Sequence, residues 1–233
     1  MSDRLKGLFI TGADTGVGKT YVGCLVAREL AAQGLRVGVY KPVETGCETI
    51  GPELHADDAE RLWLAAGSPG DRDRVCPQRF AAPLAPSLAA AAEGKSVDRQ
   101  LLFDGVEYWR ERSDIVLVEG AGGLLTPLDE DRFMAHLALE FGYPLLVVAR
   151  NALGAINQTL QTLVTAATFC QGIPVAGVVL NTRDAWPDES HSTNAIEIRR
   201  RAQAPLLSVV PHRAAGFSEP VDWLAVAQKS ATS

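Results

Sequence analysis

Short apolar runs alternate with longer amphipathic stretches along the whole chain. The runs lack in-out alternation, as expected for strands that are buried on both faces of a parallel sheet. This order predicts an α/β fold of three layers, with a mostly parallel sheet and helices on both of its faces. The predicted strands are residues 7–12, 36–43, 114–122, 144–150, 174–181 and 205–211, and the predicted helices are 19–33, 57–66, 98–112, 131–141, 154–171 and 193–203.

Two stretches interrupt this alternation. Residues 67–97 are rich in proline, and within them only the segment "SLAAAAEG" has a helical composition. We expect this stretch to cross the strand edges of one domain that spans residues 1–233. Residues 184–194, "DAWPDESHSTN", are polar and predict a mobile loop.

Charge and composition narrow the class of protein. The net charge of -6 argues against a nucleic-acid partner, because such binders carry a basic surface. No run approaches the roughly 18 apolar residues of a membrane helix, and the first residues lack the apolar core of a signal peptide. The four cysteines have neither zinc nor disulfide spacing. We therefore expect a cytoplasmic protein without a membrane partner.

The stretch "FITGADTGVGKT", residues 9–20, connects the first predicted strand to the first helix. Its Gly-Lys-Thr ending is typical of a phosphate-binding loop, although Gly12 stands one position early and Ala13 takes the usual place of the first glycine. Backbone N–H groups and the helix N-terminus would bind phosphate oxygens there. Lys19 would reach the β- and γ-phosphates, and the Thr20 hydroxyl would bind Mg²⁺.

Further polar residues follow other predicted strands at the edge where a parallel sheet binds ligands. Glu119 ends the run "DIVLVEG" and is a candidate Mg²⁺ ligand. Lys41 follows the second strand, where a cation would stabilise a transferring phosphoryl group. Asn181 ends "GVVLN", and its amide matches the donor and acceptor of adenine. Asp184 stands at the acidic position of a guanine-reading sequence whose lysine is missing, so ATP is favoured over GTP.

Taken together, these parts resemble the dethiobiotin synthetase family within the P-loop NTPase superfamily, ATP-dependent enzymes that close the ureido ring in biotin synthesis. The family's loop carries the same extra residue after its first glycine. The resemblance covers almost the whole chain, in the stretches "TGADTGVGKT", "YKPVETG", "DDAERL", "VEGAGGLLTPL", "LGAINQTL", "GVVLN" and "APLLSVVP".

This resemblance implies three substrates: 7,8-diaminononanoate, CO₂ (or bicarbonate) and ATP, with Mg²⁺ as cofactor. One amine of the diamine would capture CO₂ as a carbamate, whose oxygen would attack the γ-phosphate. The second amine would then displace phosphate from the resulting anhydride and close the ring. The family also implies a homodimer with active sites at its interface.

Each implied site residue is carried over from a matching position. Lys19 and Lys41 would be catalytic, and Thr20, Asp58 and Glu119 would organise Mg²⁺. Asp58 aligns better than Asp57 because it directly precedes "AERL". The substrate would contact Thr15, Lys41, Thr45, Gly122 and Asn157. The nucleotide would contact Gly16, Val17, Gly18, Lys19, Thr20, Tyr21, Asp58, Glu119, Gly120, Ala121, Gly122, Asn181, Thr182, Pro211, His212 and Arg213.

Two other functions fit a loop of this kind. Amidoligases that act on corrin side chains share it, but they need a glutamine-hydrolysing domain with a nucleophilic cysteine, for which this chain has no room. Partitioning and cell-division ATPases carry a second lysine just after the first glycine, whereas this chain reads Gly12-Ala13-Asp14. Dependence of ATP turnover on a diamine or on a protein partner would separate these functions.

Overall fold

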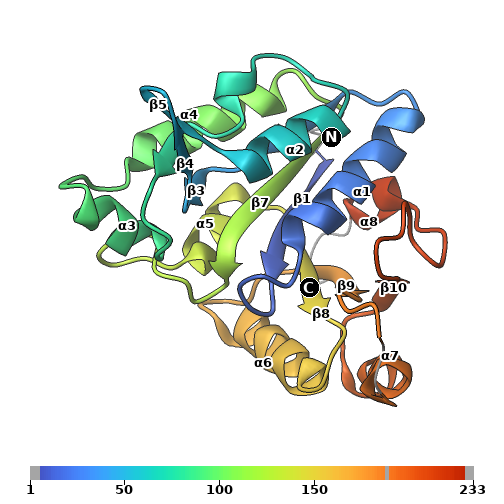
Figure 1. The fold of residues 1–233 in the computed structure, drawn as a ribbon. Coiled ribbons are helices and arrows are strands. Elements are labelled where there is room, and N and C mark those ends of the chain that lie inside the picture. Colours follow the sequence, from blue (N-terminus) through green and yellow to red (C-terminus); the bar gives the residue numbers. More distant parts are fainter. Residues whose placement is uncertain (1–5, 187–188, 229–233) are drawn as a thin grey trace.

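The computed structural model describes residues 6–186 and 189–228 and contains a parallel sheet of six strands (Figure 1). The strand order across the sheet is β10-β9-β8-β1-β7-β2. The α/β fold class is confirmed, and each of the six predicted strands is present, the second only in its first part. The strand bounds are β1 (Lys6–Gly12), β2 (Val37–Tyr40), β7 (Ile115–Gly123), β8 (Leu145–Arg150), β9 (Val175–Asn181) and β10 (Leu206–Val210).

Helices cover both faces of this sheet, as neighbouring residues of β1 demonstrate. Ile10 packs against Gly23 of α1 (Lys19–Ala32), and the same glycine meets Leu62 of α2 (Asp57–Ala65). On the opposite face the ring of Phe9 lies 6.5 Å from that of Phe141. Phe141 belongs to α5 (Met134–Phe141), which packs beside α4 (Arg99–Arg110). The core is therefore two apolar layers on either side of β1.

The remaining elements are shorter or lie at the margins. Strand β3 (Val43–Thr45) pairs with β6 (Gln78–Phe80), and β4 (Glu48–Ile50) forms a hairpin with β5 (Glu53–His55). The other helices are η1 (Arg72–Arg74), α3 (Pro86–Ala92), α6 (Ala155–Thr168), α7 (Glu189–Arg201) and α8 (Trp223–Val226).

The second predicted strand is wrong in its last residues. Strand β2 ends at Tyr40, and the Lys41 N–H donates instead to Val75 at 2.8 Å. Pro42 then has no N–H with which to continue a ladder, so the chain leaves the central sheet. Residues 43–45 form β3, which pairs with β6 inside the proline-rich stretch. The helix expected in that stretch is confirmed as α3.

The mobile loop predicted for residues 184–194 is also wrong in part. Helix α7 begins at Glu189, while residues 187–188 lie outside the described residues. Asn194 on this helix is buried, and its amide donates to the Asn151 side chain and to the Ala152 carbonyl, both at 3.0 Å. These contacts with the segment after β8 hold a polar sequence in a helix, and no local pattern reveals them.

The order of the strands places a ligand site after β1. The chain passes from β1 to β2 on one side, and later from β7 to β8 on the other side of β1. Ligands of open parallel sheets bind at such a reversal, beyond the carboxyl ends of the strands. No helix in residues 6–186 and 189–228 has the length and apolar character needed to cross a bilayer. That residues 1–233 form one domain stays a prediction.

We predict that Gly105→Ala destabilises the protein, although alanine is the better helix former by about 1 kcal/mol. A Cβ at Gly105 of α4 would lie 2.3 Å from the Tyr40 hydroxyl oxygen and 2.5 Å from Cζ. Tyr40 cannot yield easily, because it is fully buried and its hydroxyl donates to the Leu102 carbonyl at 2.9 Å. Overpacking should lower the free energy of unfolding by about 1–3 kcal/mol in urea titrations.

Gly216→Ala is the matched control, because a Cβ there meets nothing within 4 Å. Its free energy of unfolding should stay within about 0.5 kcal/mol of the wild type. A Gly105→Ala protein as stable as the wild type would contradict the packing described around Tyr40.

Candidate active site

Residues 13–18 form a loop between β1 and α1, with Gly12 as the last residue of the strand. A Cβ on Gly12 would lie 2.4 Å from the Asp14 carbonyl oxygen and 3.1 Å from that of Gly122. The early glycine thus has a steric reason, since only glycine permits this approach. Gly18 has φ 95°, and a Cβ there would lie 2.1 Å from Nδ2 of Asn181.

Side chains from two other elements hold this loop in place. Asn181, at the end of β9, donates from Nδ2 to the Val17 carbonyl at 2.9 Å. Arg183 follows it and donates to the Gly16 carbonyl. From α6, Gln158 donates to the Asp14 carboxylate at 3.1 Å. The amide of Asn181 therefore binds the loop in this structure, and its predicted pairing with adenine stays a prediction.

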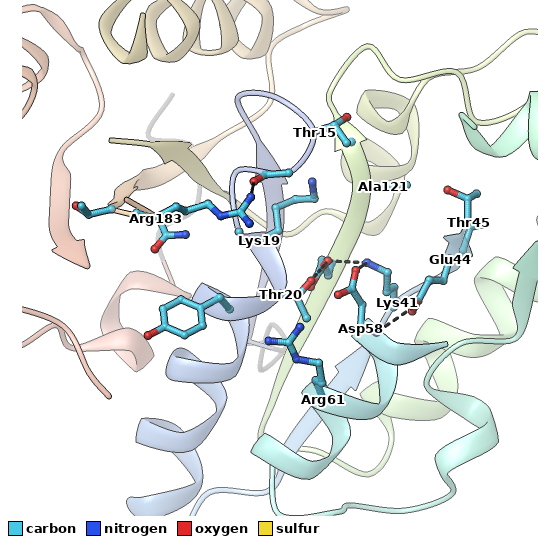
Figure 2. Close-up of a pocket in the computed structure, with 18 of the residues that line it drawn as sticks. Thr15, Lys19, Thr20, Lys41, Glu44, Thr45, Asp58, Arg61, Ala121 and Arg183 are labelled. Atoms are coloured by element: carbon cyan, nitrogen blue, oxygen red, sulfur yellow. Dashed lines mark hydrogen bonds and ion pairs between the residues drawn. The ribbon is translucent and has the colours of Figure 1, made fainter. Parts of the chain in front are cut away.

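A cluster of opposite charges lies beside the loop (Figure 2). The Lys41 ammonium is 2.6 Å from Oε1 of Glu119 and 3.0 Å from Oδ2 of Asp58. The Thr20 hydroxyl donates to the same Glu119 oxygen at 2.9 Å. Side-chain exposure is 5% for Lys41 and 1% for Glu119, so water screens this pair little. Four elements meet here: α1, the segment after β2, α2 and β7.

Burial and neighbouring charges set the pKa values of this cluster. Burial alone would lower the pKa of Lys41, but the carboxylates of Glu119 and Asp58 raise it above its ordinary value. Burial would raise the pKa of Asp58, but Lys41, Thr20 and Arg61 together more than offset it, so that pKa is lowered. Burial lowers the pKa of Lys19, and the attraction of Glu119 only partly opposes this.

A cavity of about 570 Å³ contains most of the predicted site residues. Asp58 lines it, whereas Asp57 is exposed and pairs with Arg61 at 3.6 Å. The structure thus brings Asp58, and not Asp57, to the cavity. The other predicted residues that line it are Thr15, Gly16, Gly18, Lys19, Thr20, Tyr21, Lys41, Thr45, Glu119, Ala121, Gly122, Asn181, Thr182, His212 and Arg213.

Other predicted residues do not line this cavity. Val17 belongs to the loop but its side chain is buried, and Gly120 packs against Phe9 in the core. Pro211 and Asn157 are exposed, Asn157 on the first turn of α6. One chain therefore does not bring Asn157 to the site.

A second cavity of about 820 Å³ adjoins the first. Thr15, Thr45, Ala121 and Gly122 line both cavities, so three of the predicted substrate residues stand at their junction. Two of its other walls are small or apolar, from Pro83–Pro86 and Leu124–Pro127, whereas the α6 side is polar, with Gln158, Gln161, Thr162 and Thr165.

Sequence reasoning missed four residues that line this cavity: Val43, Glu44, Arg61 and Arg183. The Glu44 carboxylate accepts the backbone N–H groups of Asp58 and Ala59, both at 3.0 Å. Arg61 lines the cavity one turn after Asp58, and helical spacing alone would have indicated it. Arg183, in the segment after β9, also lines the cavity. The only sequence feature that points to Glu44 is the lack of a capping side chain where α2 begins, because the residue there is Ala56.

The oxygen atoms of the cluster suit Mg²⁺. Within the described parts of the chain, no group of three or more His, Cys, Asp or Glu side chains is placed to hold a metal. Mg²⁺ needs no such group, because proteins bind it through one or two carboxylates together with substrate phosphates. Oε2 of Glu119 is buried and lacks a hydrogen-bond partner there, as a ligand oxygen would.

Comparison with known proteins gives consistent relatives. A family model described as an AAA domain matches residues 6–216. The chain is 42% identical over 213 residues to the ATP-dependent dethiobiotin synthetase BioD of Rhodopirellula baltica, covering 87% of this chain and 82% of that protein. The BioD protein of Anaeromyxobacter dehalogenans is 42% identical over 207 residues, with 89% and 90% covered. That of Bacillus subtilis is 36% identical over 217 residues, with 93% and 92% covered.

Solved structures are similar in fold. The signal recognition particle receptor FtsY of Elizabethkingia anophelis aligns with a TM-score of 0.55 at 17% identity, over 97% of this chain and 65% of that one. The MinC:MinD complex of Aquifex aeolicus aligns with a TM-score of 0.53 at 16% identity, over 89% and 81%. At such identities the likeness shows the P-loop NTPase fold and nothing about activity.

We predict that Lys41→Met lowers the free energy of unfolding by about 3–5 kcal/mol, because it leaves the Glu119 carboxylate buried without its cation. The double variant Lys41→Met/Glu119→Gln removes both charges. It should be more stable than Lys41→Met by at least about 1 kcal/mol, and urea titrations of Lys41→Met, Glu119→Gln and the double variant measure the coupling. Simple addition of the two single effects would contradict a direct buried pair.

Proposed function

The chain belongs to the ATP-dependent dethiobiotin synthetase family, and on that premise we propose that it is a ligase that makes dethiobiotin from 7,8-diaminononanoate, CO₂ and ATP. The observation that carries this proposal is the cluster of Lys41, Glu119, Asp58 and Thr20 beside the phosphate loop, in a cavity that adjoins a second one. Such a ligase needs a nucleotide and a second substrate side by side, and the two adjoining cavities supply that arrangement.

In this proposal ATP lies in the smaller cavity. Loop N–H groups and Lys19 would bind its phosphates, because the start of α1 is a site for anions. Tyr21, Thr182, His212 and Arg213 line the part of the cavity available to the base and ribose. Three predicted nucleotide contacts do not line the cavity, namely Val17, Gly120 and Pro211. They would assist nucleotide binding only through their backbone or by supporting the residues that line the cavity.

Thr20, Asp58 and Glu119 would hold Mg²⁺. The buried, unpartnered oxygen of Glu119 and the neighbouring hydroxyl of Thr20 support this assignment. When bound, Mg²⁺ neutralises charge on the β- and γ-phosphate oxygens.

The chemistry requires an activated carboxyl group. One amine of the diamine adds to CO₂ and loses a proton, which gives a carbamate. A carbamate oxygen then attacks the γ-phosphorus, and ADP leaves. The second amine attacks the carbonyl carbon, phosphate leaves, and a proton is released. Lys41 would hold a fixed positive charge beside the carbamate during the phosphoryl transfer, and Thr15 and Thr45 would orient the substrate.

The larger cavity would take the diamine. Its small and apolar walls suit an aliphatic chain, and Thr15, Thr45 and Gly122 would place both amines at the junction with the phosphates. Holding the second amine near the activated carbonyl gives a large effective concentration. Asn157 lines neither cavity. We therefore propose that Asn157 contributes to the partner's site in a homodimer. We also propose that the protein acts in the cytoplasm.

The first test is the reaction itself. Purified protein with MgATP, bicarbonate and 7,8-diaminononanoate should give a product whose mass has gained one carbonyl unit, with one phosphate released for each product. Lys41→Ala should lower kcat by about 10²–10³-fold, as loss of one preorganised charge does. Lys95→Ala is the matched control, since Lys95 lines neither cavity. ATP hydrolysis at a rate that does not depend on the diamine would contradict the proposal.

We also expect ATP to bind at least tenfold more tightly than GTP. Asp184 does not line the cavity, and its two carboxylate oxygens accept hydrogen bonds from Arg150 at 2.8 and 2.9 Å. It is therefore not directed at a guanine. Calorimetric titration with each nucleotide checks the ratio, which Asp184→Ala should leave unchanged. Equal affinities, or a ratio that depends on Asp184, would contradict this assignment.

A further inference from the structure

Glu44 makes contacts that neither the phosphate loop nor the proposed chemistry explains. It lies on β3 and is 6% exposed, which is unusual for a carboxylate. Each of its carboxylate oxygens accepts one backbone N–H from the first turn of α2, Asp58 on Oε1 and Ala59 on Oε2, both at 3.0 Å. A helix begins with N–H groups that lack partners, and a carboxylate placed there is also favoured by the helix dipole.

The helix itself offers no substitute for this cap. Its N-cap position is Ala56, whose side chain cannot accept a hydrogen bond. A serine or aspartate at that position would accept from the second or third N–H of the helix, which are those of Asp58 and Ala59. In this chain Glu44 performs that role from a separate strand.

Residues 41–45 therefore hold Asp58 at two points. Lys41 contacts the Asp58 carboxylate at 3.0 Å, while Glu44 accepts the Asp58 backbone N–H at 3.0 Å. One contact fixes the side chain and the other fixes the main chain. Lys41 also binds Glu119, so this short segment sets the distance between the two carboxylates of the cluster.

We propose that Glu44 is a positioning residue for Mg²⁺: by capping α2 from β3, it fixes Asp58 where the proposed metal site needs it. The proposal rests on the proposed function for the identity of the metal site. Mg²⁺ demands near-ideal octahedral geometry, so a small displacement of one ligand weakens binding strongly. Groups that orient metal ligands through a hydrogen bond typically change metal affinity by about 10–100-fold when removed.

The test measures how strongly Mg²⁺ assists ATP binding, without any turnover. Calorimetric titrations with ATP in Mg²⁺ and in EDTA give two dissociation constants, whose ratio is the metal coupling. Glu44→Ala should reduce this ratio by about 10–100-fold. Glu44→Gln keeps one acceptor oxygen and should fall between Glu44→Ala and the wild type.

Asp98→Ala is the matched control, because Asp98 caps α4 by accepting the Leu101 N–H at 3.0 Å and does not line the cavity. Loss of either cap should lower Tm by about 2–4 °C. Only Glu44→Ala should change the metal coupling. Equal losses of Tm with a wild-type coupling ratio in Glu44→Ala would overturn the proposal.

A local cap provides a rescue. In the Glu44→Ala background, Ala56→Ser supplies an oxygen to the same N–H groups. It should recover most of the lost Tm and of the lost coupling. Recovery of Tm alone would overturn positioning through the helix. If the wild-type protein bound ATP equally well in Mg²⁺ and in EDTA, the proposed Mg²⁺ site would be wrong, and this proposal with it. The proposed function is tested separately, by the formation of dethiobiotin.

Discussion

The buried contact between Lys41 and Glu119 constrains the rest of the site. At 2.6 Å and almost without exposure, each group depends on the other, because either charge alone would be costly to bury. Replacing both by apolar groups would be the cheaper way to fill such a space. The chain keeps the charges at the edge of the sheet where ligands bind, which is where fixed charges are useful. The pair also ties the segment after β2 to the middle of β7, next to the phosphate loop.

The elements around this pair are positioned by ordinary packing. β1 lies in the middle of the sheet, so the loop that follows it has strand ends on both sides. Gly12 permits the loop to approach the Gly122 carbonyl, and Asn181 binds the loop from β9. Helix α2 packs on α1 through Leu62 and Gly23, which brings its first turn toward the cluster. Apolar packing thus brings these elements together around the cluster, and polar contacts then orient the individual side chains.

Whether the sequence predicts a feature depends on how far apart in the chain the interacting residues are. The strands of the central sheet are runs of apolar residues, Lys19 and Thr20 begin α1, and Glu119 follows the apolar run of β7, so local pattern suffices. Contacts between distant segments leave no such pattern. Asn194 holds the start of α7 through Asn151, β3 leaves the sheet to pair with β6, and Glu44 caps a helix that begins beyond a hairpin. The resemblance to a family selects Asp58, which lines the cavity, but it contains no information on what holds Asp58 there.

The pKa values of the two lysines of the site are shifted in opposite directions, which indicates different roles for them. Carboxylates raise the pKa of Lys41, so it stays protonated at neutral pH and cannot accept the proton that an amine releases. It can only act as a fixed charge. Burial lowers the pKa of Lys19, which has weaker compensation from Glu119. A phosphate in the loop would supply the missing negative charge and raise that pKa again. Anion binding and protonation of Lys19 therefore favour each other.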